Sequence, residues 1–206
     1  MKKIISCLLV FVLFCGLTAC GDSGVYKKAQ TALKNEDYEQ VIELLDSIPD
    51  HDDSDNLRDS ANEGISAGIY EKAKTILDQG EYEQVIELLD SIPDYGDADG
   101  LRKSADIGIL NDIVDASAAP ECCEVASDGS YIKIDTNPND TKKFYSAEYM
   151  QTVQDINKAL GFPESLYEKM LQTRALDGRL TDENDTFSVS WSYHPDKGMS
   201  ALYERK

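Results

Sequence analysis

An internal duplication constrains the fold of this chain more than any other feature of its sequence. The thirteen residues YEQVIELLDSIPD at 38–50 recur without change at 82–94. Extending the comparison at the same offset of 44 residues pairs 25–68 with 69–112, and 26 of the 44 pairs are identical. Segments this similar must fold in the same way, so the chain contains two copies of one structural unit.

Each copy is predicted to consist of helices joined by short turns. In the second copy Gly80 can take the left-handed conformation that closes a first helix. Pro93 ends a second helix, and Asp97, whose counterpart is Asp53, stands where the cap of a third helix belongs. Spacings of three and four place the apolar residues of the second helix on one face: Tyr82, Val85, Ile86, Leu89 and Ile92. Gly64 and Gly68 predict a kink or break in the third helix of the first copy.

The pattern in the second copy resembles a tetratricopeptide repeat, which joins two helices by a Gly-x-Tyr turn: Tyr70, Ala73, Gly80-Glu81-Tyr82, Val85 and Leu89. The resemblance covers 25–112, with departures. Val41 and Val85 stand where the family has Ala, and the repeat is 44 residues long where the family has 34, so we expect looser helix packing. The resemblance implies a groove for partner peptides; the alternative is a spacer or support.

The N-terminus has the layout of a secretory signal. Lys2 and Lys3 precede an uncharged apolar run over 4–17, which is short for a membrane span. The segment LTACG, which ends in Cys20-Gly21, resembles a bacterial lipobox. That resemblance implies a signal peptide at 1–19, cleavage before Cys20, a covalent diacylglyceryl lipid on its thiol, and a tether at 20–24. The alternative is an uncleaved anchor helix.

The net charge of the chain argues against a nucleic-acid partner. The chain has 20 Lys+Arg against 39 Asp+Glu and a net charge of −19. Loss of Lys2 and Lys3 with the signal would bring the charge to −21, of which −16 lies in 21–117 and −5 in 118–206. Such a surface repels phosphate backbones, so we expect no nucleic-acid partner. The acidic repeats would also be pushed away from an anionic membrane.

A linker is expected at 113–120 and a second domain at 121–206. Alternating residues predict a strand at 131–135 and a hairpin over 186–204. Between them, one helix is expected with Ser146 as its cap, and another opened by Pro163 with Leu166, Met170 and Leu171 buried. The fold class is therefore α+β and mostly helical, with a β-α-α-β-β domain built on an antiparallel sheet.

Three segments of this domain, SDGSYIKIDTNP, TRALDGR and WSYHPDKGMSALYE, look like a domain of lipoproteins from Gram-positive bacteria that have no assigned activity. The resemblance spans 121–206. It implies a class of cell-surface protein and supplies no reaction, substrate or catalytic residue.

Few residues carry candidate chemistry. The adjacent Cys122 and Cys123 are expected to point to opposite sides of an extended segment, with a redox or metal role as the alternative. His194 is expected to be an exposed turn residue. Arg174, Asp177 and Arg179 crowd one loop with Asp182, either as mutual salt bridges and caps or as a site for a carboxylate or peptide terminus.

The acidic turn at 50–56 has no glycine at the sixth position that a calcium loop requires, so helix capping is favoured there and no metal site is expected. No acid–base or nucleophile constellation is visible, so we expect no enzyme activity and no cofactor beyond the lipid on Cys20. The sequence predicts a lipid-anchored protein on the extracytoplasmic face of the cell membrane. It would bind a protein or peptide, or serve as a scaffold, with Arg174, Asp177, Arg179 and His194 as candidate interaction residues. The alternative is an extracytoplasmic protein that binds a small ligand or cation.

Overall fold

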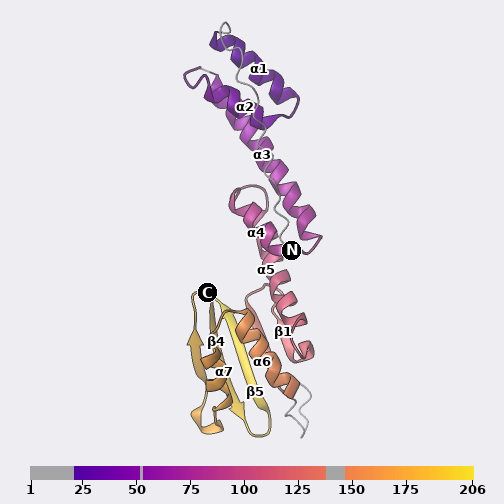
Figure 1. Ribbon diagram of the computed structural model, residues 1–206, viewed down its shortest axis with the longest axis vertical. Coiled ribbons are helices and arrows are strands. Elements are labelled where there is room, and N and C mark those ends of the chain that lie inside the picture. Colours follow the sequence, from indigo (N-terminus) through magenta and orange to yellow (C-terminus); the bar gives the residue numbers. More distant parts are fainter. Residues whose placement is uncertain (1–20, 52, 138–146) are drawn as a thin grey trace, which may run out of the picture. The chain divides into compact units, whose positions relative to one another are not determined.

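The computed structural model describes residues 21–51, 53–137 and 147–206 (Figure 1). The predicted signal peptide, Cys20 and the predicted cap Ser146 lie outside the described residues. The chain divides into two compact units, one ending at Gly68 and one beginning at Ile69. Within the described ranges, no helix combines the length and the apolar character needed to cross a bilayer.

The first copy of the repeat folds as three helices. They are α1 (Asp22–Lys34), α2 (Tyr38–Asp46) and the first part of α3 (Ser54–Leu77) (Figure 1). The predicted break in α3 is wrong, because the helix is continuous through Gly64 and Gly68. The carboxylate of Asp37 caps α2 by accepting a hydrogen bond from the Gln40 amide at 3.3 Å.

The second copy uses the rest of α3 together with α4 (Tyr82–Asp90) and α5 (Ala98–Asp115). As predicted, Gly80 has a left-handed φ of 79°, and Asp97 caps α5 by accepting from the Gly100 amide at 3.1 Å. Equivalent residues are buried in the two copies, because equivalent helix faces pack together within each copy. The equivalent buried pairs are Ala29 and Ala73, Val41 and Val85, Leu45 and Leu89, Ile48 and Ile92, and Ala61 and Ala105.

A tyrosine and a glycine recur together in both copies. The Tyr38 ring lies against Gly64 of α3, and the Tyr82 ring lies against Gly108 of α5. In each case a Cβ on the glycine would overlap the ring. These glycines therefore permit close packing of helix against ring, which explains why they stand inside helices that glycine otherwise weakens.

An ion pair is also duplicated. Arg58 contacts the Asp46 carboxylate at 2.8 Å, and Arg102 contacts Asp90 in the same way. Each pair joins the end of the second helix of its copy to the third helix. Because the four side chains are partly exposed, the pairs contribute to orientation more than to stability.

The C-terminal part contains an antiparallel sheet in the order β1-β2-β5-β4-β3. Its strands are β1 (Cys123–Val125), β2 (Tyr131–Asp135), β3 (Leu180–Glu183), β4 (Phe187–His194) and β5 (Gly198–Arg205). The α+β class is confirmed, as are the strand at 131–135 and the hairpin of β4 and β5. The predicted β-α-α-β-β order lacks β1 and β3, which are a three-residue and a four-residue strand at the two edges.

Helices α6 (Ala147–Ala159) and α7 (Glu164–Leu171) cover one face of this sheet (Figure 1). As predicted, Leu166 and Met170 are buried. Leu171 is not: its exposed fraction is 46%, because it falls at the last residue of α7, off the buried face.

Two buried hydrogen bonds tie the helical layer to the sheet. Tyr203 donates to Asn157 at 2.7 Å, and the Trp191 indole donates to Thr173 at 2.9 Å.

Helix α5 belongs to two hydrophobic clusters. Ala98 and Ala105 pack with the repeat, whereas Leu110 and Val114 pack with the sheet and α6. The segment 113–120, predicted as a linker, begins as the last turn of α5. It continues into a loop in which Ser117 and Ala119 are buried, and the Ala119 amide donates to Thr152 of α6 at 2.8 Å. The second repeat copy and the sheet are thus parts of one compact unit.

Candidate functional site

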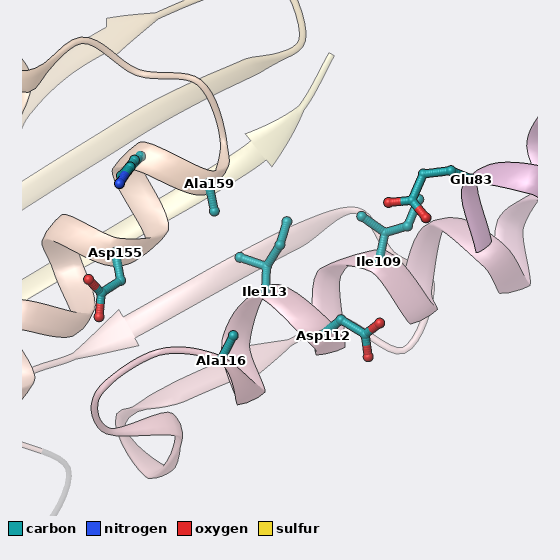
Figure 2. A pocket seen from close by; sticks show the side chains of 8 residues that line it. Glu83, Ile109, Asp112, Ile113, Ala116, Asp155 and Ala159 are labelled. Atoms are coloured by element: carbon teal, nitrogen blue, oxygen red, sulfur yellow. The ribbon is translucent and has the colours of Figure 1, made fainter. Parts of the chain in front are cut away.

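A groove of about 650 Å³ lies between α5 and α6. Its apolar floor is formed by Ile109, Ile113 and Ala116 of α5 and by Ala159 of α6, and Figure 2 shows the Ile113 side chain between the two helices. The burial of Leu110 and Val114 in the core explains why apolar residues of α5 are left to form this floor. They turn into the sheet core, so Ile109 and Ile113, one residue earlier on the helix and four residues apart, form a neighbouring, half-buried stripe.

The rim of the groove is acidic. It is formed by Glu83 of α4, Asp112 of α5 and Asp155 of α6, which Figure 2 labels. Lys158 of α6 also belongs to the lining. Three carboxylates against one ammonium give the groove a net negative charge. Asp155 is held in place, since its carboxylate accepts from the Ala118 amide at 3.2 Å and from the Gln151 side chain at 2.9 Å.

The composition of the groove indicates the kind of surface that it could bind. Its lining pairs apolar side chains with carboxylates and one lysine, which favours a partner that presents apolar groups beside cations. Among the described residues, no group of three or more His, Cys, Asp and Glu side chains is placed to hold a metal ion.

Each charged residue of the predicted interaction loop has a partner, and Arg174 and Asp177 pair with each other. Arg174 lies beside Asp177 with a guanidinium–carboxylate distance of 2.8 Å, and the Arg174 amide donates to the same carboxylate at 2.8 Å. This contact keeps the pKa of the Asp177 carboxyl below its ordinary value and raises that of Arg174. Arg179 donates to the Ser190 hydroxyl at 2.9 Å, and Asp182 is paired with Lys169 at 2.7 Å.

All four predicted interaction residues therefore have partners within the domain. The hydrogen bonds that Arg174 donates to the Asp177 carboxylate close the turn that precedes β3, which fits the capping interpretation. His194 is exposed at the end of β4, where its Nδ1 accepts from the Asp196 amide at 3.1 Å. It stabilises the β4–β5 turn.

One exposed residue in this loop escaped the sequence reasoning. Leu176 is 95% exposed, on the short helical turn Ala175–Asp177 that the Arg174–Asp177 contact holds together. A single leucine inside a charged loop gives no periodic signal, so the sequence offered no reason to separate it from buried leucines.

The two cysteines contradict the sequence expectation. Their Sγ atoms lie 3.9 Å apart, on the same side of the chain. The backbone changes from a short helical turn (Pro120–Cys122) to strand β1 between these two residues, and the alternation of an extended segment does not apply there.

The described chain is thus an α+β protein in which two copies of a helical repeat precede a five-stranded antiparallel sheet. Comparison with protein-family models, with curated proteins and with solved structures gives no match.

Proposed function

We propose that this protein is a non-catalytic, membrane-anchored extracytoplasmic lipoprotein that binds a protein or peptide partner in the groove between α5 and α6. The observation that carries the binding proposal is the combination of an apolar floor with an acidic rim. The likeness of the helical copies to tetratricopeptide repeats, a family of peptide-binding modules, supports the same function.

The lining indicates the chemistry of the partner. Ile109 and Ile113 are half-buried, so a partner that covers them removes further apolar surface from water, a gain of about 25 cal/mol for each Å². The acidic rim favours lysine or arginine beside the inserted apolar group. Because Glu83, Asp112 and Lys158 are exposed, the charges of the rim would speed association and select the partner more than they would add affinity. The expected partner segment is therefore apolar and flanked by basic residues.

Site-specific crosslinking in intact cells tests the groove. A photoreactive amino acid replaces Asp112 on the rim, and in a matched variant it replaces Lys133, an exposed residue on β2 of the sheet. We expect an identified crosslinked partner from position 112 and not from 133. Adding Ile113→Asp should abolish the product, since it places a charge in the apolar floor. Equal yields from the two positions, or a product that survives Ile113→Asp, would contradict the groove.

Anchoring is tested separately. We expect Cys20→Ala to abolish lipid attachment and signal cleavage, because the thiol that carries the lipid in a lipobox is gone. Mass spectrometry and membrane fractionation measure both effects. A variant with unchanged mass and unchanged membrane partition would refute the anchoring proposal and leave the groove proposal standing.

A further inference from the structure

The described part of the chain leaves two large apolar side chains exposed, and both belong to one stretch. Leu171 ends α7, and Leu176 lies in the loop 172–179 that joins α7 to β3. Leu176 is 95% exposed, so its own chain covers almost none of its side chain. Burial of this side chain against another apolar surface would remove it from water, which favours association.

The loop 172–179 holds Leu176 in a fixed position. The Arg174 amide donates to the Asp177 carboxylate at 2.8 Å and so closes the turn that carries the leucine. Thr173 and Arg179, near the two ends of the loop, are hydrogen-bonded to side chains of β4. A side chain on an ordered turn loses less conformational entropy on binding, so Leu176 is suited to act as an anchor in a partner's pocket.

The exposed charge of this loop is positive. Arg174 and Arg179 flank the leucine, and Asp177 supplies the one carboxylate of the loop. The Arg174 side chain is 77% exposed, whereas that of Asp177 is 26% exposed. Arg179 is exposed and donates to the neutral hydroxyl of Ser190. The loop thus presents an apolar side chain between two cations, which complements an apolar floor with an acidic rim.

We propose that the partner in the groove between α5 and α6 is a second molecule of this protein, which inserts its Leu176. This inference rests on the proposed function and names the occupant of the same site. Leu176 of one molecule packs against Ile109 and Ile113 of the other (Figure 2), and its two arginines face the acidic rim. The groove volume of about 650 Å³ lies within the range of about 300–1,000 Å³ that holds ligands larger than one side chain.

The contact joins two different surfaces of the protein. One molecule can therefore give its loop to one neighbour and accept the loop of another, so the association can extend beyond a dimer. A single loop buries little area, and contacts of small area are weak in solution. Lipid anchoring confines neighbouring molecules to one membrane and raises their effective concentration, so the association is expected in intact cells.

Crosslinking between two differently tagged forms of the full chain in intact cells tests the proposal. The donor form carries a photoreactive apolar amino acid in place of Leu176, and the acceptor form carries none. We expect a donor–acceptor product whose crosslink maps to α5 or α6 of the acceptor. In a matched donor the photoreactive residue replaces Lys197, an exposed residue of the β4–β5 turn, and about tenfold less product is expected.

Variants on both sides of the contact sharpen the test. In the acceptor, Ile113→Asp should abolish the product, because it places a charge in the apolar floor. Asp112→Lys, on the exposed surface of α5, should lower the yield about threefold and decides the test if Ile113→Asp unfolds. In the donor, Arg179→Glu should lower the yield about threefold, and the same change of charge at Lys197 should leave it unchanged.

The outcomes separate this inference from the proposed function. An unchanged yield from position 176 with a folded Ile113→Asp acceptor, or with Asp112→Lys, would overturn the proposal. If position 112 captures a different protein and position 176 gives no product, the second molecule is refuted as the partner and the groove proposal stands. If neither position gives a product, both proposals fail.

Discussion

Glu36 and Gly80 occupy equivalent positions in the two repeat copies, and both residues have a positive φ, 60° for Glu36 and 79° for Gly80. This conformation is unfavourable for a residue with a Cβ and open to glycine. Each residue follows the first helix of its copy. The duplicated fold thus requires a left-handed backbone conformation at this position. Only the second copy has a glycine there, which adopts this conformation without strain.

Glu36→Gly should therefore stabilise the first unit. Relief of left-handed strain is worth about 1–2 kcal/mol, and the greater freedom of glycine in the unfolded chain offsets about 0.5–1 kcal/mol. We expect a net gain of about 0.5–1 kcal/mol in the free energy of unfolding, measured by urea denaturation. The reciprocal change Gly80→Glu should destabilise by a similar amount. Shifts of the same sign in both variants would refute the strain explanation.

Glycines 64 and 68 lie four residues apart in α3 and should respond oppositely to alanine. At Gly64 a Cβ overlaps the Tyr38 ring, so we expect Gly64→Ala to destabilise by about 1–3 kcal/mol. A Cβ at Gly68 would have no atom within 4 Å beyond the neighbouring backbone of its own helix, so Gly68→Ala should stabilise by about 0.5–1 kcal/mol through helix propensity alone. Chemical denaturation followed by circular dichroism measures both. A stabilising Gly64→Ala would rule out the close ring contact.

Sequence reasoning at this scale succeeded where a residue follows a local rule. Gly80 and Asp97 hold the predicted positions at helix ends because capping depends on a few neighbouring residues. It failed at Gly64, whose role depends on a ring 26 residues earlier in the chain. It also failed at the cysteine pair, where a change of backbone conformation between two neighbours decided the side-chain directions.

At the scale of helices and strands, periodicity found the elements that have a clear apolar face. The burial of Phe187, Val189 and Trp191 along β4 follows the alternation of the sequence. Strands β1 and β3 were missed because edge strands of three and four residues are too short to show a period. The groove could not be located from the sequence either. Ile109 and Ile113 belong to a helix, and its sequence does not determine which neighbouring element covers each of its faces.

The loop after α7 is joined to β4 by the buried hydrogen bond from the Trp191 indole to Thr173. Thr173→Val should destabilise the domain by about 1–3 kcal/mol, because it leaves a buried N–H without an acceptor. Thr173→Ser keeps the hydroxyl and should retain most of the stability. Denaturation followed by the fluorescence of Trp191, the only tryptophan in the chain, measures both. Equal losses in the two variants would point to lost packing of the methyl group rather than to the hydrogen bond.

At the scale of the whole molecule, the division into two units does not coincide with the division into repeats and sheet. The first repeat copy forms one unit, whereas the second copy and the sheet form the other. The reason lies in α5, which packs through Ala105 with the repeat and through Leu110 with the sheet. A boundary drawn from composition at 113–120 could not reveal a helix shared by two hydrophobic clusters.

This division predicts separate responses to core truncation. Leu45→Ala, in the first unit, should lower the midpoint of a transition seen by circular dichroism and leave that of Trp191 fluorescence unchanged. Leu110→Ala, in the second, should shift the fluorescence midpoint. Both leucines are at most 1% exposed, so each change should destabilise its unit by about 2–5 kcal/mol. Coincident shifts in both signals for both variants would show that the units unfold as one.

Gly68 and Ile69, where the two units meet, lie within helix α3 and not in a loop. The third helix of one copy therefore passes directly into the first helix of the next. A gene that duplicates at this point joins helix to helix in the same register, and no new turn has to evolve. Chains of this kind should lengthen or shorten by whole multiples of 44 residues, and recombination between the gene segments that encode the identical stretches 38–50 and 82–94 provides the genetic route for such changes.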